Sequence, residues 1–237
     1  MPLILGLDTE TQGLDATKDR VTEWGLVLWD SETKQPVRIS GFLVKVPGGV
    51  SSEIEKLTGI TNSLLETYGV EPAQALKAVL AMAEKADFIC AHNAEFDKGF
   101  YEAEYKRANI VPYTRPWIDT RVDLPVEAYQ RGKSASLKYL ACDHNFTYDA
   151  HRAVSDVLAM LRLVGMYDVN TIIKRAQTPN IFVRAVIDYD NRLLAKERGY
   201  YWRPEAKLWV KPLKADLVDE EKQKAPFPVV VMAGDVK

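Results

Sequence analysis

Alternating apolar and polar stretches in the first fifty residues predict three β-strands. A largely apolar run over residues 2–9 is typical of a buried strand, and residues 21–29 and 38–46 have the pattern of two more. Turn-forming residues fill the segment between the second and third runs, residues 30–36. We therefore expect these three strands to form an antiparallel meander.

After residue 50 the pattern becomes helical and then alternates between strand and helix. Polar residues at 51–55 are typical of a helix start, and the Glu71-Pro72 pair predicts a helix that runs to about residue 85. The remaining predicted elements are a strand at 87–91, a helix at about 94–107, a short strand at 117–120, and helices at 134–142 and about 150–167. A meander followed by strand–helix units predicts an α/β fold with a mixed sheet covered by helices, in a domain spanning residues 1–175.

The rest of the chain predicts a separate, small α+β module over residues 180–214, followed by a charged and then apolar tail at 215–237. Its elements are a strand at 181–187, a short helix at 191–198 and a hairpin at 200–212. Eight basic residues outnumber four acidic ones in this module and alternate with aromatic residues, a composition suited to phosphate contacts and base stacking. Trp202 and Trp209 are expected instead to be buried in the module's own core.

The composition is that of an ordinary folded domain. Hydrophobic residues make up 47% of the chain and charged residues 27%, which excludes intrinsic disorder and coiled coil for most of it. With 31 basic against 33 acidic residues, the formal net charge of −2 excludes binding to nucleic acid by bulk positive charge alone. No apolar run approaches the ~20 residues that span a bilayer, and Cys90 and Cys142 lie in apolar runs typical of buried, reduced thiols. We therefore expect a soluble, cytoplasmic protein without a membrane partner.

Two carboxylates stand side by side at the end of the first predicted strand. Side chains alternate between the faces of a strand, so Asp8 and Glu10 point the same way. Such a pair is stable at low cost where cations neutralise it. Alternatively, the segment is an ordinary strand end that enters a polar turn, with Gly13 supplying a positive φ.

Two further polar groups lie at the predicted starts of helices. His92, Asn93 and Asp97 follow a buried strand, where a helix N-terminus offers backbone N–H groups to a phosphate, although the same residues also suit an ordinary helix cap. His151 and Asp156 lie at the head of the last helix of the first domain. Five positions on a regular helix place two side chains about 140° apart, so these two cooperate only if His151 lies in the loop or in a frayed first turn. The structural alternative is an exposed histidine at a helix start.

Together, Asp8, Glu10, Asp97 and Asp156 supply four carboxylates from three separate segments. His151 adds a group that takes up a proton near neutral pH. Hard oxygen ligands favour Mg²⁺ or Mn²⁺ over zinc, and two such ions about 4 Å apart are suited to in-line phosphoryl displacement. The sequence therefore indicates a metal-dependent site for phosphate chemistry.

In order and spacing, these motifs resemble those of the DEDDh branch of the DnaQ-like 3′–5′ exonucleases. The resemblance covers roughly residues 1–170 and is carried by Asp8-x-Glu10, His92-Asn-Ala-x-Phe-Asp97 and His151-x4-Asp156. It implies a ribonuclease H-like fold, in which a mixed five-stranded sheet is flanked by helices. A histidine rather than a tyrosine five positions before Asp156 indicates the His branch of the family.

The resemblance also implies a role for each matching residue. Asp8, Glu10 and Asp156 would bind two divalent cations, Mg²⁺ or Mn²⁺, and Asp97 would complete the metal site. His151 would be the general base that deprotonates the attacking water. Nucleoside 5′-monophosphates would then be released one at a time from a 3′ end.

A second set of residues would contact the end of the substrate. The resemblance implies that Gly13 and Leu14 lie against the terminal base, with Leu14 as an apolar wedge, and that Thr9, His92 and Asn93 line the site. The expected partners are nucleic-acid 3′ ends, DNA rather than RNA, and a polymerase or repair protein bound through the C-terminal region. Two alternatives stay open: an exoribonuclease of the same fold, and a non-catalytic nucleic-acid-binding or polymerase-associated subunit.

Overall fold

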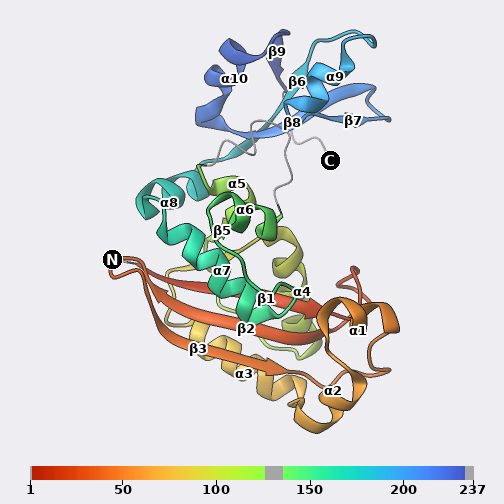
Figure 1. Ribbon diagram of the computed structural model, residues 1–237, viewed down its shortest axis with the longest axis vertical. Coiled ribbons are helices and arrows are strands. Elements are labelled where there is room, and N and C mark those ends of the chain that lie inside the picture. The colour runs from red at the N-terminus through yellow and green to blue at the C-terminus, as the bar shows by residue number, and fades with distance from the viewer. Residues whose placement is uncertain (1, 126–135, 233–237) are drawn as a thin grey trace. The chain divides into compact units, whose positions relative to one another are not determined.

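The computed structural model describes residues 2–125 and 136–232 of the chain, which divides into two units (Figure 1). The first unit comprises residues 1–124 and 136–172, and the second comprises residues 125–135 and 173–237. The first two residues of the helix predicted at 134–142 and the last five of the predicted tail lie outside the described residues.

The first unit is built on a mixed five-stranded sheet with the strand order β3-β2-β1-β4-β5. Its strands are β1 (Leu3–Thr11), β2 (Val21–Asp30), β3 (Gln35–Leu43), β4 (Phe88–Ala91) and β5 (Trp117–Asp119). The first three pair antiparallel, as the predicted meander requires, and β4 and β5 join them in parallel. Strand β3 starts earlier than predicted and includes Pro36, which is tolerated because β3 is an edge strand.

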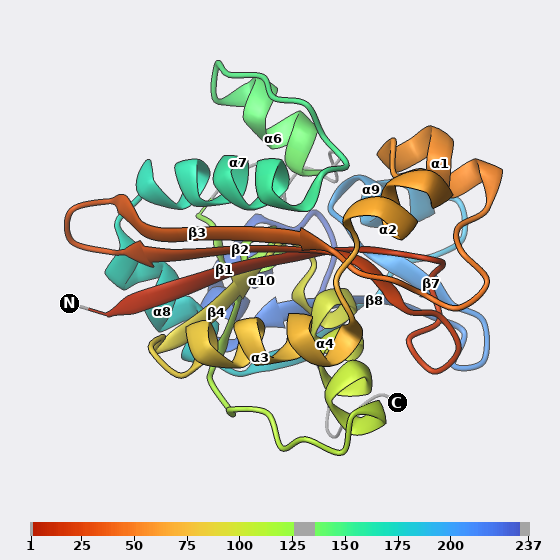
Figure 2. The ribbon, with the colours of Figure 1, turned by 90° about the horizontal axis from the view of Figure 1, so that it is seen from below.

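Helices cover both faces of this sheet, as Figure 2 shows edge-on. The helices described before β6 (Asn180–Ala185) are α1 (Ser52–Thr58), α2 (Asn62–Tyr68), α3 (Pro72–Ala83), α4 (Ala94–Arg107), α5 (Thr120–Asp123), α6 (Leu137–Asp143), α7 (Ala153–Gly165) and α8 (Val169–Gln177), the last of which is divided between the two units. Helix α7 packs on β1, β2 and β3, whereas α3 and α4 lie on the opposite face. The single helix start predicted at 51–55 is followed by two helices, because Gly59 adopts a φ of 71° and ends α1, and the Thr61 hydroxyl then caps α2.

The alternation of side chains on β1 decides which residues enter the core. Leu5 and Leu7 are buried against Leu76 and Val79 of α3 and Phe100 of α4. The intervening positions of β1 therefore point to the face that α7 covers. This alternation places the acidic end of the strand beneath α7.

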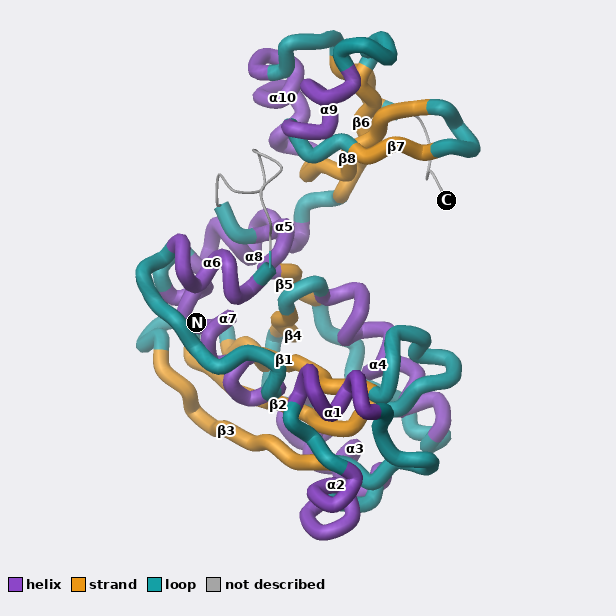
Figure 3. Tube along the Cα trace, turned by 45° about the vertical axis from the view of Figure 1, so that its right-hand side comes forward, coloured by secondary structure: helices purple, strands orange, loops and turns teal. Residues whose placement is uncertain are grey.

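The second unit contains a four-stranded antiparallel sheet with the order β7-β8-β6-β9, drawn in orange in Figure 3. Its elements are β6 (Asn180–Ala185), α9 (Arg192–Glu197), β7 (Tyr201–Arg203), β8 (Leu208–Lys214), a 3₁₀ turn (Ala215–Leu217), α10 (Val218–Lys224) and β9 (Val229–Val231). The predicted strand, helix and hairpin are all present. Among the described residues of both units, no helix combines the length and the apolar character of a membrane span.

Two predictions for this unit are wrong. The expected tail is folded as far as residue 232, because Val218 and Phe227 enter the core and β9 pairs with β6. Trp202 is 45% exposed rather than buried, because β7 is the edge strand of the sheet. Trp209 is only partly buried against the core.

The predicted burial of the cysteines is confirmed for one of them. Cys90 in β4 is buried, and burial raises the pKa of its thiol. Cys142 is exposed, because α6 turns Leu137, Leu140 and Ala141 to the core and residue 142 lies on the other side of the helix.

Candidate active site

Three carboxylates meet where β1 ends. Asp8 and Glu10 lie two positions apart on β1 and point to the face that α7 covers, and Asp156 lies in the first turn of α7. One carboxylate oxygen from each of the three lies within 4.8 Å of the other two. The fold thus brings together residues from two segments almost 150 positions apart in the sequence.

Two glycines allow α7 to lie close enough to the sheet for this meeting. A Cβ atom on Gly25 would lie 2.3 Å from a backbone atom of α7, and one on Gly41 would lie 2.3 Å from a side-chain atom of the same helix. Gly25 stands opposite Asp8 in the pairing of β1 with β2, and Gly41 stands opposite Gly25 in the pairing of β2 with β3. Because Gly25 and Gly41 have no side chains, the first turn of α7 packs directly on β2 and β3. This close packing brings Asp156 to the end of β1.

The loop before α7 fixes the carboxylate of Asp156 with three hydrogen bonds. The Tyr148 hydroxyl donates to Oδ1 at 2.8 Å, and the backbone N–H groups of His151 and Arg152 donate to Oδ2 at 2.8 and 3.1 Å. His151 has a φ of 68°, and α7 begins only at Ala153, later than predicted. His151 therefore lies in the loop, where the five-residue spacing requires it to be if it is to cooperate with Asp156.

Asp97 lies beside this cluster and approaches β1 from the opposite face. It occupies the first turn of α4 and is only 2% exposed. Its Oδ1 accepts a hydrogen bond of 2.8 Å from the Thr9 hydroxyl, which points away from Asp8 because the side chains of β1 alternate. The buried Thr9 hydroxyl, expected at the substrate surface, thus orients Asp97 instead.

Burial raises the pKa of all four carboxyl groups. The pKa of Glu10 rises to about 8, first through burial and then through the charge of Asp156, and burial raises the pKa of Asp97 to about 7. The pKa of Asp8 is held well above its usual range by burial and by the neighbouring carboxylates, and burial raises the pKa of Asp156. A set of closely spaced carboxylate oxygens with raised pKa values fits a hard divalent cation such as Mg²⁺ or Mn²⁺.

An ion pair between the buried Glu23 and the half-exposed Arg152, beside the cluster, was not predicted from the sequence. Glu23 stands opposite Glu10 in the pairing of β1 with β2 and is 5% exposed. The guanidinium Nη2 of Arg152 lies 2.8 Å from Oε1 of Glu23, and the N–H of Ala153 donates to Oε2 at 3.0 Å. The pair ties the residue that follows His151 to the sheet. A glutamate inside an apolar strand was the only signal for it in the sequence.

The loop after β1 presents Leu14, the predicted wedge, to solvent. Leu14 is 87% exposed. The carbonyl of Gly13 accepts a hydrogen bond of 2.6 Å from the Thr11 hydroxyl, and a Cβ atom on Gly13 would lie 2.4 Å from Oδ2 of Asp19. Gly13 is therefore needed for its missing side chain, since its φ is not among the positive ones in the part of the chain that the structure describes.

His92 and Asn93, at the junction of β4 and α4, are held by the last residue of β5 and the first residues of α5. Nδ1 of His92 lies 2.9 Å from the Thr120 hydroxyl, and Oδ1 of Asn93 accepts a hydrogen bond of 3.0 Å from Arg121. The N–H of Asn93, expected to be free for a phosphate, instead donates to Asp119 at 3.0 Å. Asp119 thus occupies the start of α4, and no local pattern in the sequence marks it for this position.

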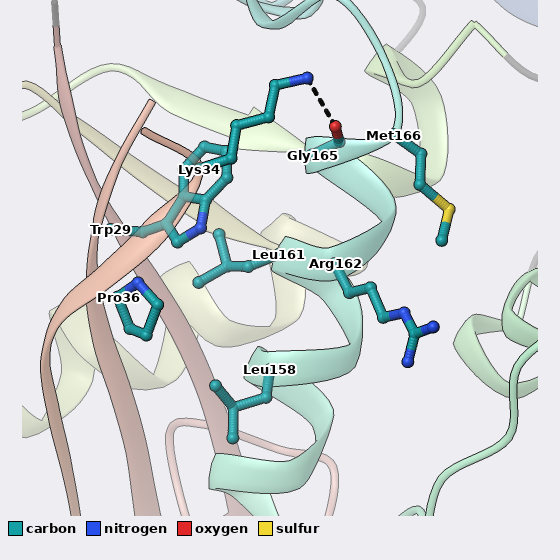
Figure 4. A pocket seen from close by; sticks show the side chains of 8 residues that line it. All are labelled: Trp29, Lys34, Pro36, Leu158, Leu161, Arg162, Gly165 and Met166. Atoms are coloured by element: carbon teal, nitrogen blue, oxygen red, sulfur yellow. Dashed lines mark hydrogen bonds between the residues drawn. The ribbon is translucent and has the colours of Figure 1, made fainter. Parts of the chain in front are cut away.

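A hollow of about 310 Å³, lined by residues of α7 and of the β2–β3 hairpin, contains none of the carboxylates of this cluster (Figure 4). It is lined by Trp29, Lys34, Pro36, Leu158, Leu161, Arg162, Gly165 and Met166. The ammonium group of Lys34 donates to the carbonyl of Gly165 at 2.7 Å and so caps the end of α7. No carboxylate is among the residues that line this hollow.

Comparison with known proteins connects this geometry to a family. A family model described as Exonuclease (RNase T) matches residues 5–164, more than half of the chain. A second model, described as Domain of unknown function (DUF8626), matches residues 181–232. The two matches fall on the mixed sheet and on the C-terminal sheet, respectively.

Similar curated proteins include "DNA polymerase III PolC-type" of Thermotoga petrophila, 35% identical over 115 residues, which are 48% of this chain and 8% of that protein. The protein of the same name from Mycoplasma pneumoniae is 26% identical over 163 residues, 68% of this chain and 11% of that protein. The chain thus spans about a tenth of the length of these relatives.

Solved structures share the fold at lower sequence identity. An E. coli exonuclease I–ssDNA complex aligns with a TM-score of 0.67 and 16% identity, over 98% of this chain and 63% of that one. The nuclease domain of 3′hExo, described as a DEDDh family member, aligns with a TM-score of 0.57 and 16% identity, over 70% of this chain and 90% of that one. The predicted ribonuclease H-like fold is confirmed, and the chain belongs to the RNase T/DnaQ-like family of DEDD 3′–5′ exonucleases.

Proposed function

We propose that this chain hydrolyses DNA one nucleotide at a time from the 3′ end, with two divalent cations, and releases nucleoside 5′-monophosphates. The observation that carries this proposal is the convergence of Asp8, Glu10 and Asp156 within 4.8 Å. Among the described residues, no lysine or arginine forms an ion pair with any of the three. Such a cluster therefore requires bound cations to neutralise its negative charge.

The chain's own residues would hold and orient the cations, Mg²⁺ or Mn²⁺. Asp8, Glu10 and Asp156 would be direct ligands, and Asp97 would complete the site from the other face of β1. When bound, the ions supply positive charge that stabilises the phosphate and the leaving 3′ oxygen. The Thr9 hydroxyl fixes Asp97, and three hydrogen bonds fix Asp156, so the ligands are oriented before substrate binds.

His151 would be the general base. An imidazole nitrogen takes up a proton near neutral pH, as deprotonation of the attacking water requires. The backbone of His151 is bound to Asp156, while its side chain is exposed. This combination supports a base that stands next to the cluster and still reaches the substrate.

The end of the substrate would lie against the loop after β1 and the junction of β4 and α4. Leu14, 87% exposed on a loop with fixed backbone contacts, would pack against the terminal base, with Gly13 beside it. His92 and Asn93 would line the other side, held by Thr120 of α5 and Asp119 of β5. Thr9 would contribute through Asp97 rather than by direct contact.

The names of the similar proteins favour DNA as the substrate. PolC-type DNA polymerases, an exonuclease I–ssDNA complex and an exonuclease X complex with 5′ overhanging duplex DNA (TM-score 0.52, 19% identical) are all among them. A 3′-exonuclease that recognises a histone mRNA stem-loop aligns with a TM-score of 0.55 and supports the exoribonuclease alternative. A polymerase or repair protein would be a partner through the C-terminal region. The non-catalytic alternative is less well supported, because all five motif positions hold the residue types that catalysis needs.

A gel assay on 5′-labelled single-stranded DNA and matched RNA tests the proposal. Each strand is incubated with Mg²⁺, with Mn²⁺ and with EDTA, beside Asp8→Ala and a control, Glu32→Ala, that removes an exposed carboxylate from the turn between β2 and β3. We expect a metal-dependent ladder that shortens from the 3′ end, faster on DNA, absent in Asp8→Ala and normal in Glu32→Ala. A faster ladder on RNA would reassign the substrate, and no ladder on either strand would contradict the proposal.

A further inference from the structure

The ring of His151 depends on an unusual backbone for its position. His151 has a φ of 68°, which is uncommon for a residue other than glycine and persists where neighbouring contacts hold it. Within residues 2–125 and 136–232, the His151 ring forms no hydrogen bond of its own. The direction of the imidazole is therefore fixed by the contacts that hold the loop before α7.

Two carboxylates hold this loop at three consecutive backbone N–H groups. Those of His151 and Arg152 donate to Oδ2 of Asp156 at 2.8 and 3.1 Å. That of Ala153 donates to Oε2 of Glu23 at 3.0 Å. Asp156 lies on α7 itself, whereas Glu23 lies on β2. Glu23 therefore joins the end of this loop to the sheet.

The side chain of Arg152 strengthens this link to β2. Its Nη2 lies 2.8 Å from Oε1 of Glu23, and its Nε donates to both carboxylate oxygens, at 3.3 and 3.2 Å. A planar guanidinium that binds both oxygens of a carboxylate fixes direction as well as distance. The residue that directly follows His151 is thus held in one orientation on the sheet.

Glu23 is placed to act on the loop rather than on a cation. It stands opposite Glu10 in the pairing of β1 with β2 and is 5% exposed, so it adds a negative charge beside the cluster. Its two oxygens are bound by Arg152 and Ala153, and it is not among the carboxylates that converge within 4.8 Å. An apolar pair of similar size often stabilises a fold as well as a buried ion pair does, so stability alone does not explain a charge at this position.

We propose that Glu23 is a positioning residue for hydrolysis: together with Arg152, it holds the loop of His151 so that the imidazole faces the attacking water. This role rests on the proposed function of His151 as the general base. A base must lie within hydrogen-bond reach of the proton that it takes, and a displacement of about 1 Å can lower the rate about 100-fold. Glu23 itself touches neither the cations nor the substrate and acts through His151.

Steady-state kinetics of the full chain on single-stranded DNA test this role. Glu23→Gln keeps the shape of the side chain but removes the charge that Arg152 binds. We expect it to lower kcat about tenfold, because the loop is loosened, and to keep KM and the Kd for Mn²⁺ at the wild-type values. Arg152→Lys keeps the positive charge but not the planar fork, so its kcat should lie between those of the wild type and Glu23→Gln. Wild-type kcat in Glu23→Gln, or a weaker affinity for Mn²⁺, would overturn the proposal.

The first unit contains a matched control for the loss of a buried charge. Glu104 of α4 is 4% exposed, and its Oε1 lies 2.7 Å from Nε of Arg20 and 3.0 Å from Nη1 of Arg107. It repeats the pairing of Glu23 on the face of the sheet opposite α7 (Figure 2). We expect Glu104→Gln to lower the melting temperature, as Glu23→Gln does, but to keep kcat. An equal loss of kcat in both variants would be a general effect of a broken ion pair and would overturn the proposal.

A double variant shows whether Glu23 acts through His151. In His151→Ala no imidazole is left to position, so the addition of Glu23→Gln should leave kcat at the value of His151→Ala alone. If the two losses of kcat multiplied instead, Glu23 would act on another group and the proposal would be overturned.

A measurement without turnover separates this role from the exonuclease proposal. The chain has three histidines, His92, His144 and His151, so their imidazole signals in an NMR spectrum are assigned by substitution. In the metal-free protein, Glu23→Gln should move the His151 signal and leave the other two in place, and Glu104→Gln should move none. Loss of turnover in His151→Ala, together with wild-type kcat and an unmoved His151 signal in Glu23→Gln, would overturn this role alone. Full turnover by His151→Ala would overturn the general-base role and this one with it.

Discussion

The two units of this chain both bury carboxylates, but they treat the negative charge in opposite ways. In the C-terminal unit, Glu221 lies 2.9 Å from a guanidinium nitrogen of Arg198 and 3.3 Å from the ammonium of Lys211. Burial by itself would raise the pKa of Glu221, but the hydrogen bond from Arg198 and the charge of Lys211 hold that pKa below its usual range. In the first unit, no lysine or arginine of the described residues forms an ion pair with Asp8 or Glu10, and burial raises the pKa of both.

The difference distinguishes a structural carboxylate from one kept for an external cation. The first unit can also pair a buried carboxylate, since Glu104 binds Arg20 at 2.7 Å and Arg107 at 3.0 Å. The lack of an ion pair at Asp8 and Glu10 among the described residues is therefore a local feature of the end of β1. Uncompensated charge in a packed site costs stability, and such groups cluster where binding or catalysis uses them.

Removing a carboxylate from the cluster is the strongest way to test this contrast. Asp8→Ala should lower turnover about 10³-fold or more, since a metal ligand is lost, and should not lower the melting temperature of the metal-free protein, since a repulsive charge is lost too. Steady-state assays and thermal melting in EDTA measure the two effects. Retained activity, or a large loss of stability, would contradict the assignment of Asp8 to an external cation.

Removing the proposed base should separate catalysis from metal binding. His151→Ala should lower kcat by about 10²-fold, because the attacking water loses its proton acceptor, and should leave the affinity for Mn²⁺ unchanged. Single-turnover kinetics and metal titration check these outcomes. His144→Ala is not a suitable control, because the His144 ring forms hydrogen bonds with the Leu140 carbonyl and the Tyr167 hydroxyl, and their loss would change stability. Full activity of His151→Ala would show that another group takes the proton.

Removing the charge of the paired carboxylate, Glu221, should lower stability and leave turnover unchanged, the reverse of the result expected for Asp8. Glu221→Gln leaves Lys211 buried without its counter-charge, so we expect a loss of about 3 kcal/mol of stability in the C-terminal unit. Turnover of a trinucleotide should stay at the wild-type rate. Chemical denaturation measures the loss, with Glu220→Gln, which breaks a solvent-exposed pair with Lys224, as the matched control. Equal stability of the two variants would remove the contrast between the units.

The pH dependence of stability should sharpen the contrast further. The pKa of Glu10 is about 8 in the folded chain against an ordinary 4.5, so the folded state holds this proton more tightly than the unfolded one. The metal-free wild type should therefore lose stability as the pH rises from about 4.5 through about 8. Glu10→Gln should melt at a higher temperature than the wild type at pH 9 in EDTA, and at a similar one near pH 4. If Glu10→Gln and the wild type melted at the same temperature at pH 9 as well as near pH 4, the raised pKa of Glu10 would be contradicted.

Strong local patterns explain what the sequence predicted of the fold. The apolar run of β1, the turn after β2 and the continuous helix α4 each carry their own signal, and α4 begins and ends where predicted, at Ala94–Arg107. Strand β9 carries none, because it has three residues and forms only by pairing with β6, more than forty positions earlier. Helix α7 begins later than its periodicity indicates, because His151 adopts a left-handed φ.

The same division between local and distant signals applies to the candidate site. Alternation on β1 was enough to place Asp8 and Glu10 on one face. The five-residue spacing gave only a condition, that His151 cooperates with Asp156 if it lies outside the regular helix, and the structure meets that condition. The ion pair of Glu23 with Arg152 joins residues 129 positions apart, and the bond from Asn93 to Asp119 depends on the parallel pairing of β4 with β5. Such partners are created by topology, and no motif in a single sequence marks them.

Calorimetric titration with Mn²⁺ tests most directly whether the carboxylate cluster is kept for external cations. The wild type should bind Mn²⁺ at pH 7 and release protons as it does so, because the raised pKa values leave the cluster partly protonated. The heat of binding should therefore change with the ionisation enthalpy of the buffer. Binding should be lost in Asp8→Asn and kept in Glu32→Gln. No binding by the wild type, or unchanged binding by Asp8→Asn, would contradict this account.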